Sequence, residues 1–444
     1  MLISRATRAA ALAACATFLL ASSACGTDES DEPTATSVRL YGTDGNMLNS
    51  FPTELGDRAD LVDGMKGTTP LTPLPADFKD RLRSIDPDLT SFVYAAEAYD
   101  AVLISALAAQ LAGTTDPAAV AAQIIGVTNG GQRCETAVAC LALARDGRNI
   151  EYRSVSITRS GFTAAGEPST ASYATLHFDG TQINDAKTEF VGAGSESTAS
   201  SAPPPGAGAA EQNDDAPLVL GGLLPQTGDL ALSNPPLAAG AALAIQEINA
   251  AGGVLGAPVT WIDGDDGTNP AVAKATVASH AAAGVHVIIG AGASGISRAV
   301  LPDVVQAGLV LFSPSNTAAS LTDLNDEGRY FRTAPPDSLQ GRALADVILR
   351  DGPQQIAIVA RQDSYGAGLQ EIVRSELERA GLGADQLNLS TYQPPEDAEA
   401  APVDFTSVVR EIKESGADAV LIIGFSESAG LIRALTDAGV PLHH

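Results

Sequence analysis

The chain has 444 residues, of which 53 are acidic and 26 are basic, so its formal net charge is -27 at pH 7. This length is too great for a single-core domain and suits two lobes with appended segments. The negative charge argues against binding nucleic acid through its phosphates, and we expect no nucleic-acid partner.

The first residues have the pattern of a secretory signal. Arg5 and Arg8 precede an apolar stretch over residues 9–21, and the sequence SSACG then brings Cys25 to the expected cleavage point. The chain is therefore expected to be exported from the cytoplasm.

Cys25 and the acidic, Thr-rich segment after it resemble the start of a bacterial lipoprotein, in which this cysteine is lipidated. We predict a lipoprotein signal peptide over residues 1–25, lipidation at Cys25 and a tether over residues 26–37. The expected location is outside the cytoplasm, held to the bacterial cell membrane by the lipid anchor. Ordinary cleavage without lipidation is the alternative, because Ser22 stands where a lipobox usually has Leu.

Residues 38–188 mix strands and helices. The segment begins with a predicted strand, VRLYGTDG, and a Gly- and Pro-rich passage follows to Pro75. Helical patterning then appears in DFKDRLRSI and in SFVYAAEAYDAVLISALAAQLAG, which ends at Gly113. Tyr94 and Tyr99, in the second of these helices, are expected to pack in the core. Short strands are predicted in NIEYRSVSI and ASYATLHF.

Cys134 and Cys140 are the cysteines expected in the mature domain. In an oxidising compartment we predict a disulfide between them, with two free thiols as the alternative. Six residues along a continuous helix rise about 9 Å, which is beyond the reach of a disulfide. A turn must therefore interrupt the sequence QRCETAVAC.

Residues 189–217 are rich in Ser, Pro, Gly and Ala, have almost nothing to bury, and are predicted to form a solvated linker. A regular alternation of strands and helices then fills residues 218–444. The predicted strands are LVLGGLL, APVTWID, HVIIG, LVLFS, QIAIVA, LNLSTY and AVLIIG, each followed by a helix. This alternation predicts an α/β fold with parallel sheets, and Trp261 is expected in its core.

The order of these elements is unusual. The alternation stops after a helix, near Leu442, while the chain from Val38 begins with a strand that no helix precedes. Joining the end to the beginning would repair both defects, and a flexible linker of about 27 residues spans roughly 28 Å. We interpret the chain as a circular permutation of one two-lobed fold; two truncated modules or a fragment is the alternative.

Two of the predicted strands, HVIIG and LVLFS, end in small and polar residues. These are Gly290, Gly292, Ser294 and Gly295 after the first strand, and Ser313, Ser315, Asn316 and Thr317 after the second. Ligands of parallel sheets bind at the carboxyl ends of the strands. Hydroxyl groups and backbone N–H groups at helix N-termini bind anions, so we expect the carboxylate of a small ligand here.

The sequence GAGASG, residues 290–295, also matches the G-x-G-x-x-G pattern of dinucleotide sites. The acidic residue expected at the end of the next strand is absent, because LVLFS runs into Ser313 and Pro314. A dinucleotide site is therefore not the favoured interpretation.

Two other motifs are weaker. GFSES, residues 424–428, resembles a nucleophile elbow, but its last position is Ser, and the histidines after it are confined to the chain end. DGDDGTN, residues 263–269, misses the spacing of a calcium loop and is expected to be an acidic turn. We predict no enzyme activity, no metal and no cofactor.

A series of motifs resembles the type I periplasmic binding proteins, in particular the leucine/isoleucine/valine-binding family that serves ABC importers. From residue 218 the motifs are GLLPQTGDLA, AIQEINAAGGVLGAPV, IIGAGASGISRA, FSPSNTAASLT, YFRTAPPDSLQGRALA, DSYGAGLQ and GFSESAGLIRAL. The remaining part of the family pattern precedes them, in YGTDGNM, GMKGTTP, FVYAAEAYDAV and GEPSTASYATLHF. The resemblance implies two doubly wound α/β lobes joined by crossover strands, with residues 38–188 corresponding to the family's C-terminal portion and residues 218–444 to its N-terminal portion.

The resemblance also implies a binding site. Ser294, Ser315, Asn316 and Thr317 would hold the ligand carboxylate, and Asn316 replaces the family's usual Ala. Asp44 would pair with the ligand ammonium, although it could instead be a solvated turn residue. Tyr365 and Phe425 would contact the ligand from the second lobe, and Phe425 lacks the hydroxyl of the family's Tyr.

The implied function is binding a branched-chain or related amino acid, or an amide, between two closing lobes and presenting it to an ABC permease. The alternative function is a ligand-sensing receptor lobe that acts with a separate membrane partner. A permuted relic that no longer binds a ligand is a further alternative.

Overall fold

The computed structural model describes residues 37–202, 217–395 and 401–443. The predicted signal peptide, Cys25 and all but the last residue of the predicted tether lie outside these residues, as does the central part of the predicted linker. Residues Thr36–His444 form one compact unit.

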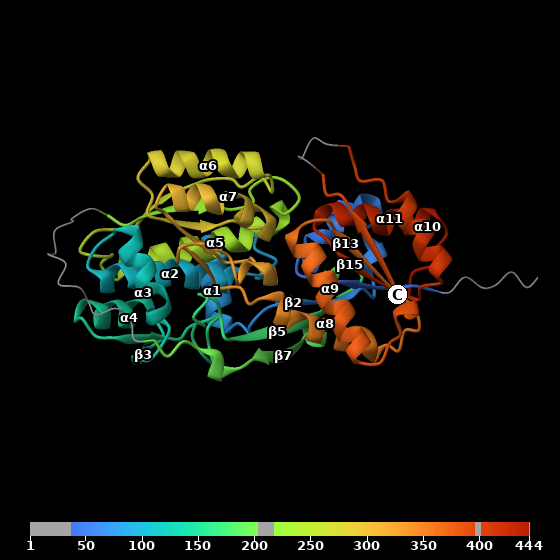
Figure 1. Ribbon diagram of the computed structural model, residues 1–444, viewed down its shortest axis with the longest axis horizontal. Helices are drawn as coiled ribbons and strands as arrows, with labels where there is room; N and C mark the ends of the chain where they lie inside the picture. Colours follow the sequence, from blue (N-terminus) through green and yellow to red (C-terminus); the bar gives the residue numbers. More distant parts are fainter. Residues whose placement is uncertain (1–36, 203–216, 396–400, 444) are drawn as a thin grey trace, which may run out of the picture. The chain divides into compact units, whose positions relative to one another are not determined.

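Five parallel strands form the first sheet, in the order β12, β11, β10, β8 and β9. They are Val219–Leu223 (β8), Thr260–Ile262 (β9), Val287–Gly290 (β10), Val310–Ser313 (β11) and Tyr330–Arg332 (β12). The helices that follow β8, β9 and β10 are Asn234–Ala250 (α5), Pro270–Ala282 (α6) and Ser294–Gln306 (α7). The predicted alternation of strands and helices is confirmed for β8 to β10, whose helices α5, α6 and α7 are labelled in Figure 1. After β11 it is not: only the 3-10 turn Ala319–Leu321 separates β11 from β12, a strand that was not predicted.

Helices from the first part of the chain pack against this sheet. They are Ala76–Ile85 (α1), Ala95–Ala112 (α2), Pro117–Val127 (α3) and Ala137–Arg145 (α4). Val102 of α2 shares a hydrophobic core with Leu220 of β8 and Phe312 of β11. Helix α2 is long and apolar enough to cross a membrane, but 94% of it is buried inside the unit, as in the core helix of a globular domain. We call this sheet together with α1 to α7 lobe 1.

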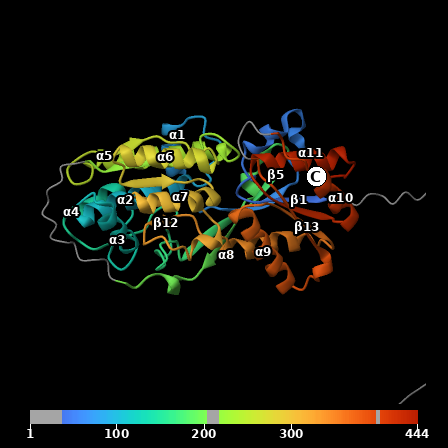
Figure 2. The same ribbon diagram turned by 45° about the horizontal axis from the view of Figure 1, so that its top comes forward.

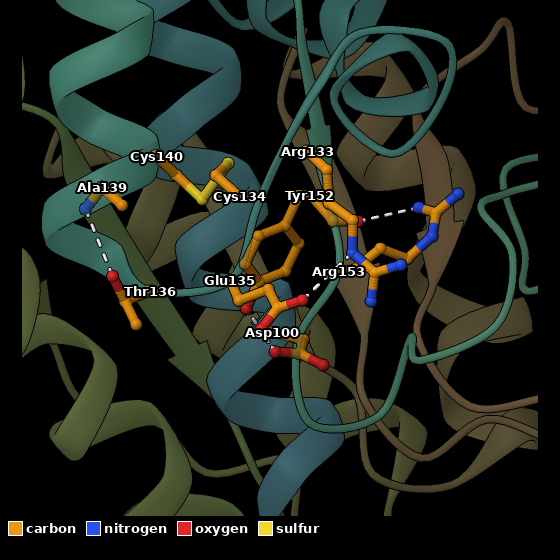
Figure 3. The surroundings of a disulfide bond; sticks show 9 residues. All are labelled: Asp100, Arg133, Cys134, Glu135, Thr136, Ala139, Cys140, Tyr152 and Arg153. Carbon is orange, nitrogen blue, oxygen red and sulfur yellow. Dashed lines mark hydrogen bonds and ion pairs between the residues drawn. A yellow bond between two sulfur atoms is a disulfide. The ribbon is translucent and has the colours of Figure 1, made fainter.

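The two cysteines of lobe 1 are joined by a disulfide, shown in Figure 3, with their Cα atoms 5.3 Å apart. Cys134 ends the short strand Gln132–Cys134 (β3), which pairs with Ile150–Tyr152 (β4), and Cys140 lies on α4. The turn required between them is present, because α4 begins only after Thr136, whose hydroxyl accepts the Ala139 N–H.

The second sheet has eight strands, in the order β14, β13, β15, β1, β2, β5 and β6, with β7 also paired to β5. They are Arg39–Gly42 (β1), Lys66–Pro70 (β2), Thr170–Asp179 (β5), Gln182–Ile183 (β6), Glu189–Gly194 (β7), Ile356–Arg361 (β13), Leu387–Tyr392 (β14) and Ala419–Ile423 (β15). Its helices are Asp337–Arg350 (α8), Ser364–Arg379 (α9), Thr406–Ser415 (α10) and Ala429–Asp437 (α11). We call this sheet and these helices lobe 2 (Figure 2).

The predicted class of two α/β lobes is confirmed, but the sheet of lobe 2 is mixed. Strands β14, β13, β15, β1 and β2 are mutually parallel, whereas β5 runs antiparallel to β2, β6 and β7.

Strand β1 lies between β15 and β2 in this sheet. Tyr41 of β1 is in register with Leu421 of β15 on one side and with Lys66 of β2 on the other. Beside β1, the Val38 N–H donates to the Pro441 carbonyl at 2.8 Å, and the His443 N–H donates to the Val38 carbonyl at 2.9 Å. The first and last parts of the described chain are therefore neighbours in one sheet.

Two predictions from composition need correction. The Gly- and Pro-rich passage before Pro75 contains a 3-10 helix, Phe51–Val62, and the interior strand β2. The sequence KGTTP of β2 carries turn-forming residues, yet Thr68 and Thr69 are buried. The predicted linker does not begin at Glu189, because β7 extends from this residue and pairs with β5 through its backbone although its side chains are largely exposed.

Candidate functional site

A narrow pocket with a cavity volume of about 20 Å³ lies between the two lobes. Its lining residues from lobe 1 are Tyr94, Leu230, Ser233, Gly292, Ala293, Ser294, Ser315 and Thr317, and those from lobe 2 are Asp44, Gly45, Tyr365 and Phe425. Six of the seven predicted ligand-binding residues line this pocket. None of its lining residues is Lys or Arg.

One end of the pocket is rich in hydroxyl groups. Ser294 is the first residue of α7, and its Oγ accepts the backbone N–H groups of Thr317 at 3.2 Å and Ala318 at 3.1 Å. Because both N–H groups donate to this oxygen, the hydroxyl proton of Ser294 is left to be donated to another acceptor. Ser294 thus joins the end of β10 to the loop after β11.

Ser315 and Asn316 hold that loop in place. Ser315 Oγ donates to the Gly292 carbonyl at 2.8 Å. Asn316, predicted to contact the ligand, does not line the pocket: its buried amide donates to the carbonyls of Ala291 and Gly292, both at 3.0 Å. The amide oxygen of Asn316 also accepts the Tyr330 hydroxyl at 3.1 Å. Asn316 therefore shapes the hydroxyl-rich end without reaching it.

Asp266 accepts a hydrogen bond from the Gly292 N–H, one of the backbone N–H groups that were expected to bind the ligand. Its Oδ2 accepts the Gly292 N–H at 2.7 Å, and its Oδ1 accepts the Thr268 N–H at 2.7 Å. Burial raises the pKa of Asp266 to about 7, although these two hydrogen bonds act to lower it. The segment 263–269 is thus a structural turn behind the pocket, and the described residues contain no cluster of three or more side chains suited to a metal ion.

Asp44 provides the acidic end of the pocket. Its Oδ2 accepts the Tyr94 hydroxyl at 2.8 Å, and its Oδ1 lies 2.9 Å from the Tyr365 hydroxyl. Tyr365 Oη is also 2.8 Å from Thr43 Oγ1. Its single proton goes to the carboxylate, the stronger acceptor, and Thr43 then donates to the phenol oxygen. Burial raises the pKa of Asp44, and the hydrogen bonds from both tyrosines partly offset that rise.

A second carboxylate lies behind the pocket at Asp337, the first residue of α8. Its side chain is fully buried, and neither carboxylate oxygen meets a hydrogen-bond partner among the described residues. Burial raises the pKa of Asp337 well above its usual range, and the negative charge of Asp44 raises it further. Its backbone N–H donates to the carbonyl of Thr317, a lining residue, at 2.7 Å.

Aromatic rings form the wall contributed by lobe 2. Tyr365 and Phe425 are stacked, with their ring centroids 5.5 Å apart and an interplanar angle of 20°. Leu230 lines the pocket from lobe 1. The pocket therefore combines a hydroxyl-rich end, an acidic end and an apolar wall.

Two further residues of the site, Tyr94 and Asp337, were not among the predicted ligand-binding residues. Tyr94 immediately precedes α2 in a left-handed conformation, with φ +63°, and its hydroxyl reaches Asp44. The prediction that Tyr94 only packs in the core is therefore incomplete, because it also lines the pocket. Tyr99 points elsewhere: its hydroxyl donates to Glu247 at 2.6 Å, and its ring meets Phe78 edge-on.

The structure does not support the dinucleotide site or the nucleophile elbow that two of the motifs resembled. The GAGASG segment contributes to the same small pocket through residues 292–294. Ser426 lies beside Asp229, to whose carbonyl its N–H donates at 3.2 Å, whereas His443 lies beside Val38. Ser426 and His443 therefore do not form a pair of nucleophile and base. Trp261 is half-buried, and its ring packs directly against the backbone of Gly222. A Cβ added to Gly222 would lie only 2.5 Å from this ring.

Residues 217–443 match the sequence model of the periplasmic binding protein family, which is half of the chain. Among relatives, the Leu/Ile/Val-binding protein homolog 3 of Brucella melitensis is 26% identical over 227 residues, covering 51% of this chain and 59% of that protein. The leucine-, isoleucine-, valine-, threonine-, and alanine-binding protein of Pseudomonas aeruginosa is 28% identical over 218 residues, covering 49% of this chain and 56% of that protein.

The chain is also similar to a solved ABC transporter substrate-binding protein of Desulfitobacterium hafniense in complex with Leu. The identity is 26%, the TM-score is 0.40, and the match covers 51% of this chain and 65% of that protein. A branched-chain amino acid transporter substrate-binding protein of Streptococcus pneumoniae, in complex with isoleucine, is 23% identical with a TM-score of 0.42, covering 51% of this chain and 63% of that one. The chain thus spans less than two thirds of the length of the relatives it matches.

Proposed function

Because the chain belongs to the periplasmic binding protein family, we propose that it binds a small amino acid, or an amide related to one, between its two lobes. The observation that carries this proposal is a single pocket with opposite chemistry at its two ends. Ser294, Ser315 and Thr317 line one end, and Asp44 lies at the other. An α-amino acid has a carboxylate and an ammonium group that match these ends.

In the proposed complex, the Ser294 hydroxyl donates to the ligand carboxylate. The Asp44 carboxylate accepts from the ligand ammonium, and Asp337 lies behind it. Burial raises the pKa of the Tyr94 and Tyr365 phenols well above the usual range, so both remain protonated donors that orient Asp44. A bound ammonium favours the ionised form of Asp44 and so offsets its burial.

The ligand side chain would pack against Phe425 and Leu230. The relatives named above are leucine-, isoleucine- and valine-binding proteins, and this supports a branched-chain or similarly small side chain. The same proposal has four further parts. The protein carries its ligand to an ABC permease, is lipid-anchored at Cys25, lies outside the cytoplasm and catalyses no reaction.

We also propose that the chain is a circular permutation of the two-lobed fold. In this proposal residues 38–188, together with β7, are the family's C-terminal portion, the residues from β7 to 217 connect the two portions, and residues 218–444 are the N-terminal portion. The support is the position of β1 between β15 and β2, with the Val38 N–H bonded to the Pro441 carbonyl. A chain in the family order would run directly from this point into β1.

The binding proposal is tested by isothermal titration of the compact unit, residues 36–444, with L-leucine, L-isoleucine, L-valine, L-alanine and small amides. We expect at least one amino acid to bind. Asp44→Asn should weaken its affinity at least tenfold, about 1.4 kcal/mol, because a buried ammonium would lose its ionic partner.

Asp57→Asn is the matched control, since Asp57 is exposed in the 3-10 helix of lobe 2 and should leave the affinity unchanged. Binding of no amino acid, or equal affinity in wild type and Asp44→Asn, would contradict the proposal.

A further inference from the structure

Four charged side chains meet beside the aromatic wall of the pocket, where the two lobes touch. Arg361 ends β13, Asp363 caps the N-terminus of α9, and Glu427 lies in the 3-10 turn Ser426–Ser428, all in lobe 2. Asp229 belongs to the loop before α5 in lobe 1. We call these four residues the interlobe cluster.

Arg361 is the centre of this cluster. Its Nε lies 2.6 Å from Asp363 Oδ2, its Nη1 lies 2.8 Å from Glu427 Oε1, and its Nη2 lies 3.7 Å from Asp229 Oδ2. The Arg361 side chain is only 4% exposed, so these interactions are shielded from water and from salt.

The cluster is bonded directly to the pocket wall. The Arg361 guanidinium lies 3.8 Å from the centroid of the Phe425 ring, a cation–π contact. Asp363 Oδ1 accepts the Tyr365 N–H at 3.0 Å, and Glu427 accepts the Phe425 N–H. Across the lobes, the Ser426 N–H donates to the Asp229 carbonyl at 3.2 Å.

The interlobe cluster has more acidic than basic groups, because one guanidinium, that of Arg361, is paired with three carboxyl groups. Asp363 and Glu427 are held in lobe 2 by their own backbone contacts, whereas Asp229 approaches from lobe 1. The pKa of Asp229 is raised to about 6; burial is the largest cause, the negative charge of Glu427 acts in the same direction, and Arg361 acts to lower it. Without Arg361, the contact between the lobes would bring Asp229 against the carboxylates of Asp363 and Glu427 with no cation between them.

We propose that Arg361 is a positioning residue of the binding cleft: it fixes Phe425 in the pocket wall and supplies the positive charge that lets Asp229 meet lobe 2 when the lobes close. This inference rests on the proposed function in that closure is taken to accompany ligand binding. Arg361 does not line the pocket itself and acts through Phe425 and through the lobe contact.

The test is a double-mutant cycle on residues 36–444, titrated with L-leucine at pH 7.5. Arg361→Gln should weaken affinity at least tenfold. Asp229→Asn in the Arg361→Gln background should recover at least threefold of that loss, because it removes the carboxylate that Arg361 balances. Arg361→Lys should keep more affinity than Arg361→Gln, and Arg350→Gln, which breaks an exposed ion pair of lobe 2, should stay within twofold of wild type.

A pH series separates charge balance from a purely structural loss. The affinity ratio of wild type to Arg361→Gln should shrink between pH 7.5 and pH 5, because protonation of Asp229 removes the repulsion, while pH effects common to both proteins cancel in the ratio. A ratio that is constant with pH, together with no recovery in the double variant, would overturn the proposal.

A distance measurement makes the inference independent of leucine. Cysteines replacing the exposed Val272 on α6 and Leu389 on β14 place one spin label on each lobe. Residues 36–444 otherwise contain only the disulfide-bonded Cys134 and Cys140. Without ligand at pH 7.5, Arg361→Gln should lower the population with the short interlobe distance, and Asp229→Asn should restore it.

If wild type binds no leucine and the distance populations still respond in this way, the proposed ligand fails and the role of Arg361 stands. If wild type binds leucine and neither affinity nor distance responds to the Asp229 substitution, the role of Arg361 fails and the binding function stands.

Discussion

Gly290 ends strand β10 in a backbone conformation that suits only glycine. Its φ is +143°, and a Cβ at this position would lie 2.0 Å from the carbonyl oxygen of Leu223 on the neighbouring strand β8. The strand end leads directly into Gly292 and Ser294, so this close approach sets where the hydroxyl-rich end of the pocket begins.

We predict that Gly290→Ala lowers the free energy of unfolding by roughly 3 kcal/mol, because a backbone oxygen cannot move aside as a flexible side chain can. Urea denaturation of residues 36–444 measures this change. Gly368→Ala is the control: Gly368 lies within α9 with no atom within 4 Å of an added Cβ, and the substitution should stabilise by about 0.5–1 kcal/mol. Equal effects of the two substitutions would contradict the steric explanation.

At single residues, the sequence was informative where a polar side chain directly follows a strand. Ser294, Ser315 and Thr317 follow the neighbouring strands β10 and β11, so their meeting at the strand ends could be predicted. Asp44 follows β1 in the other sheet, and its place in the site was expected only from the family resemblance. Tyr94 and Asp337 could not be predicted, because their place in the site depends on how the start of α2 and the start of α8 face Asp44 across the fold. The inward turn of Asn316 depends likewise on carbonyl groups that only the folded loop brings together.

Among the elements, the disulfide links β3 to α4 in lobe 1, and neither cysteine lines the pocket. Cys140 is fully buried and Cys134 is 5% exposed, so the bond also belongs to the packed core of this lobe. The same region contains Asp100 of α2, which accepts the Tyr152 hydroxyl at 2.5 Å and the Ser156 N–H at 2.8 Å.

We predict that the double substitution of Cys134 and Cys140 by Ser lowers the free energy of unfolding by about 2 kcal/mol, the effect expected for closing so short a loop. Chemical denaturation with and without a thiol reductant measures it, and reduction of wild type should reproduce the loss. Amino-acid affinity should not change, since neither cysteine lines the pocket. Loss of affinity on reduction would show that the two regions are coupled.

Strands and helices were predictable wherever apolar periodicity is strong, as in residues 218–444. Strands β2 and β7 were missed for physical reasons. β2 contains Gly, Thr and Pro and is stabilised by pairing with β1 and β5 on either side. β7 exposes Phe190 and Val191 and is held by backbone pairing with β5. Neither leaves a periodic pattern in the sequence.

In the whole molecule, several carboxyl groups are buried without a cationic partner. Burial raises the pKa of Glu97 to about 8 and that of Asp266 to about 7, and it also raises the pKa of Asp44, Asp100 and Asp337. Between about pH 4 and pH 8 the folded protein therefore retains protons that the unfolded chain, with ordinary carboxyl pKa values near 4, has released.

Stability should accordingly be highest near pH 4 and fall as pH rises to 8, opposite to a protein stabilised by ion-paired carboxylates. The measurement is the free energy of unfolding of residues 36–444 across this range. Glu97→Gln should flatten the slope between pH 5 and 8, whereas the exposed Asp57→Asn should not change it. A stability that rises with pH would contradict the prediction.

The proposed permutation predicts that the elements can be reordered. A chain running from residue 217 to 442, then through a short Gly- and Ser-rich join to residues 38–202, should fold to the same two lobes, because Val38 already contacts Pro441. We expect it to unfold in one transition and to bind the same amino acid with an affinity within about threefold of wild type. Failure of the reordered chain to fold, while the native order folds, would argue against the permutation.

The position of β1 also bears on how this protein reaches its native state. The strand occupies the middle of the lobe 2 sheet, yet its partner β15 begins at Ala419, near the other end of the sequence. Pairing at so large a separation along the chain is slow, since the entropy of closing so long a loop must be lost before the contact is formed. Lobe 1 can assemble its parallel sheet from residues 219–332 alone. We therefore expect the sheet of lobe 1 to form first and the lobe 2 sheet to close last, leaving the unpaired edges of β15 and β2 exposed to aggregation in the interval.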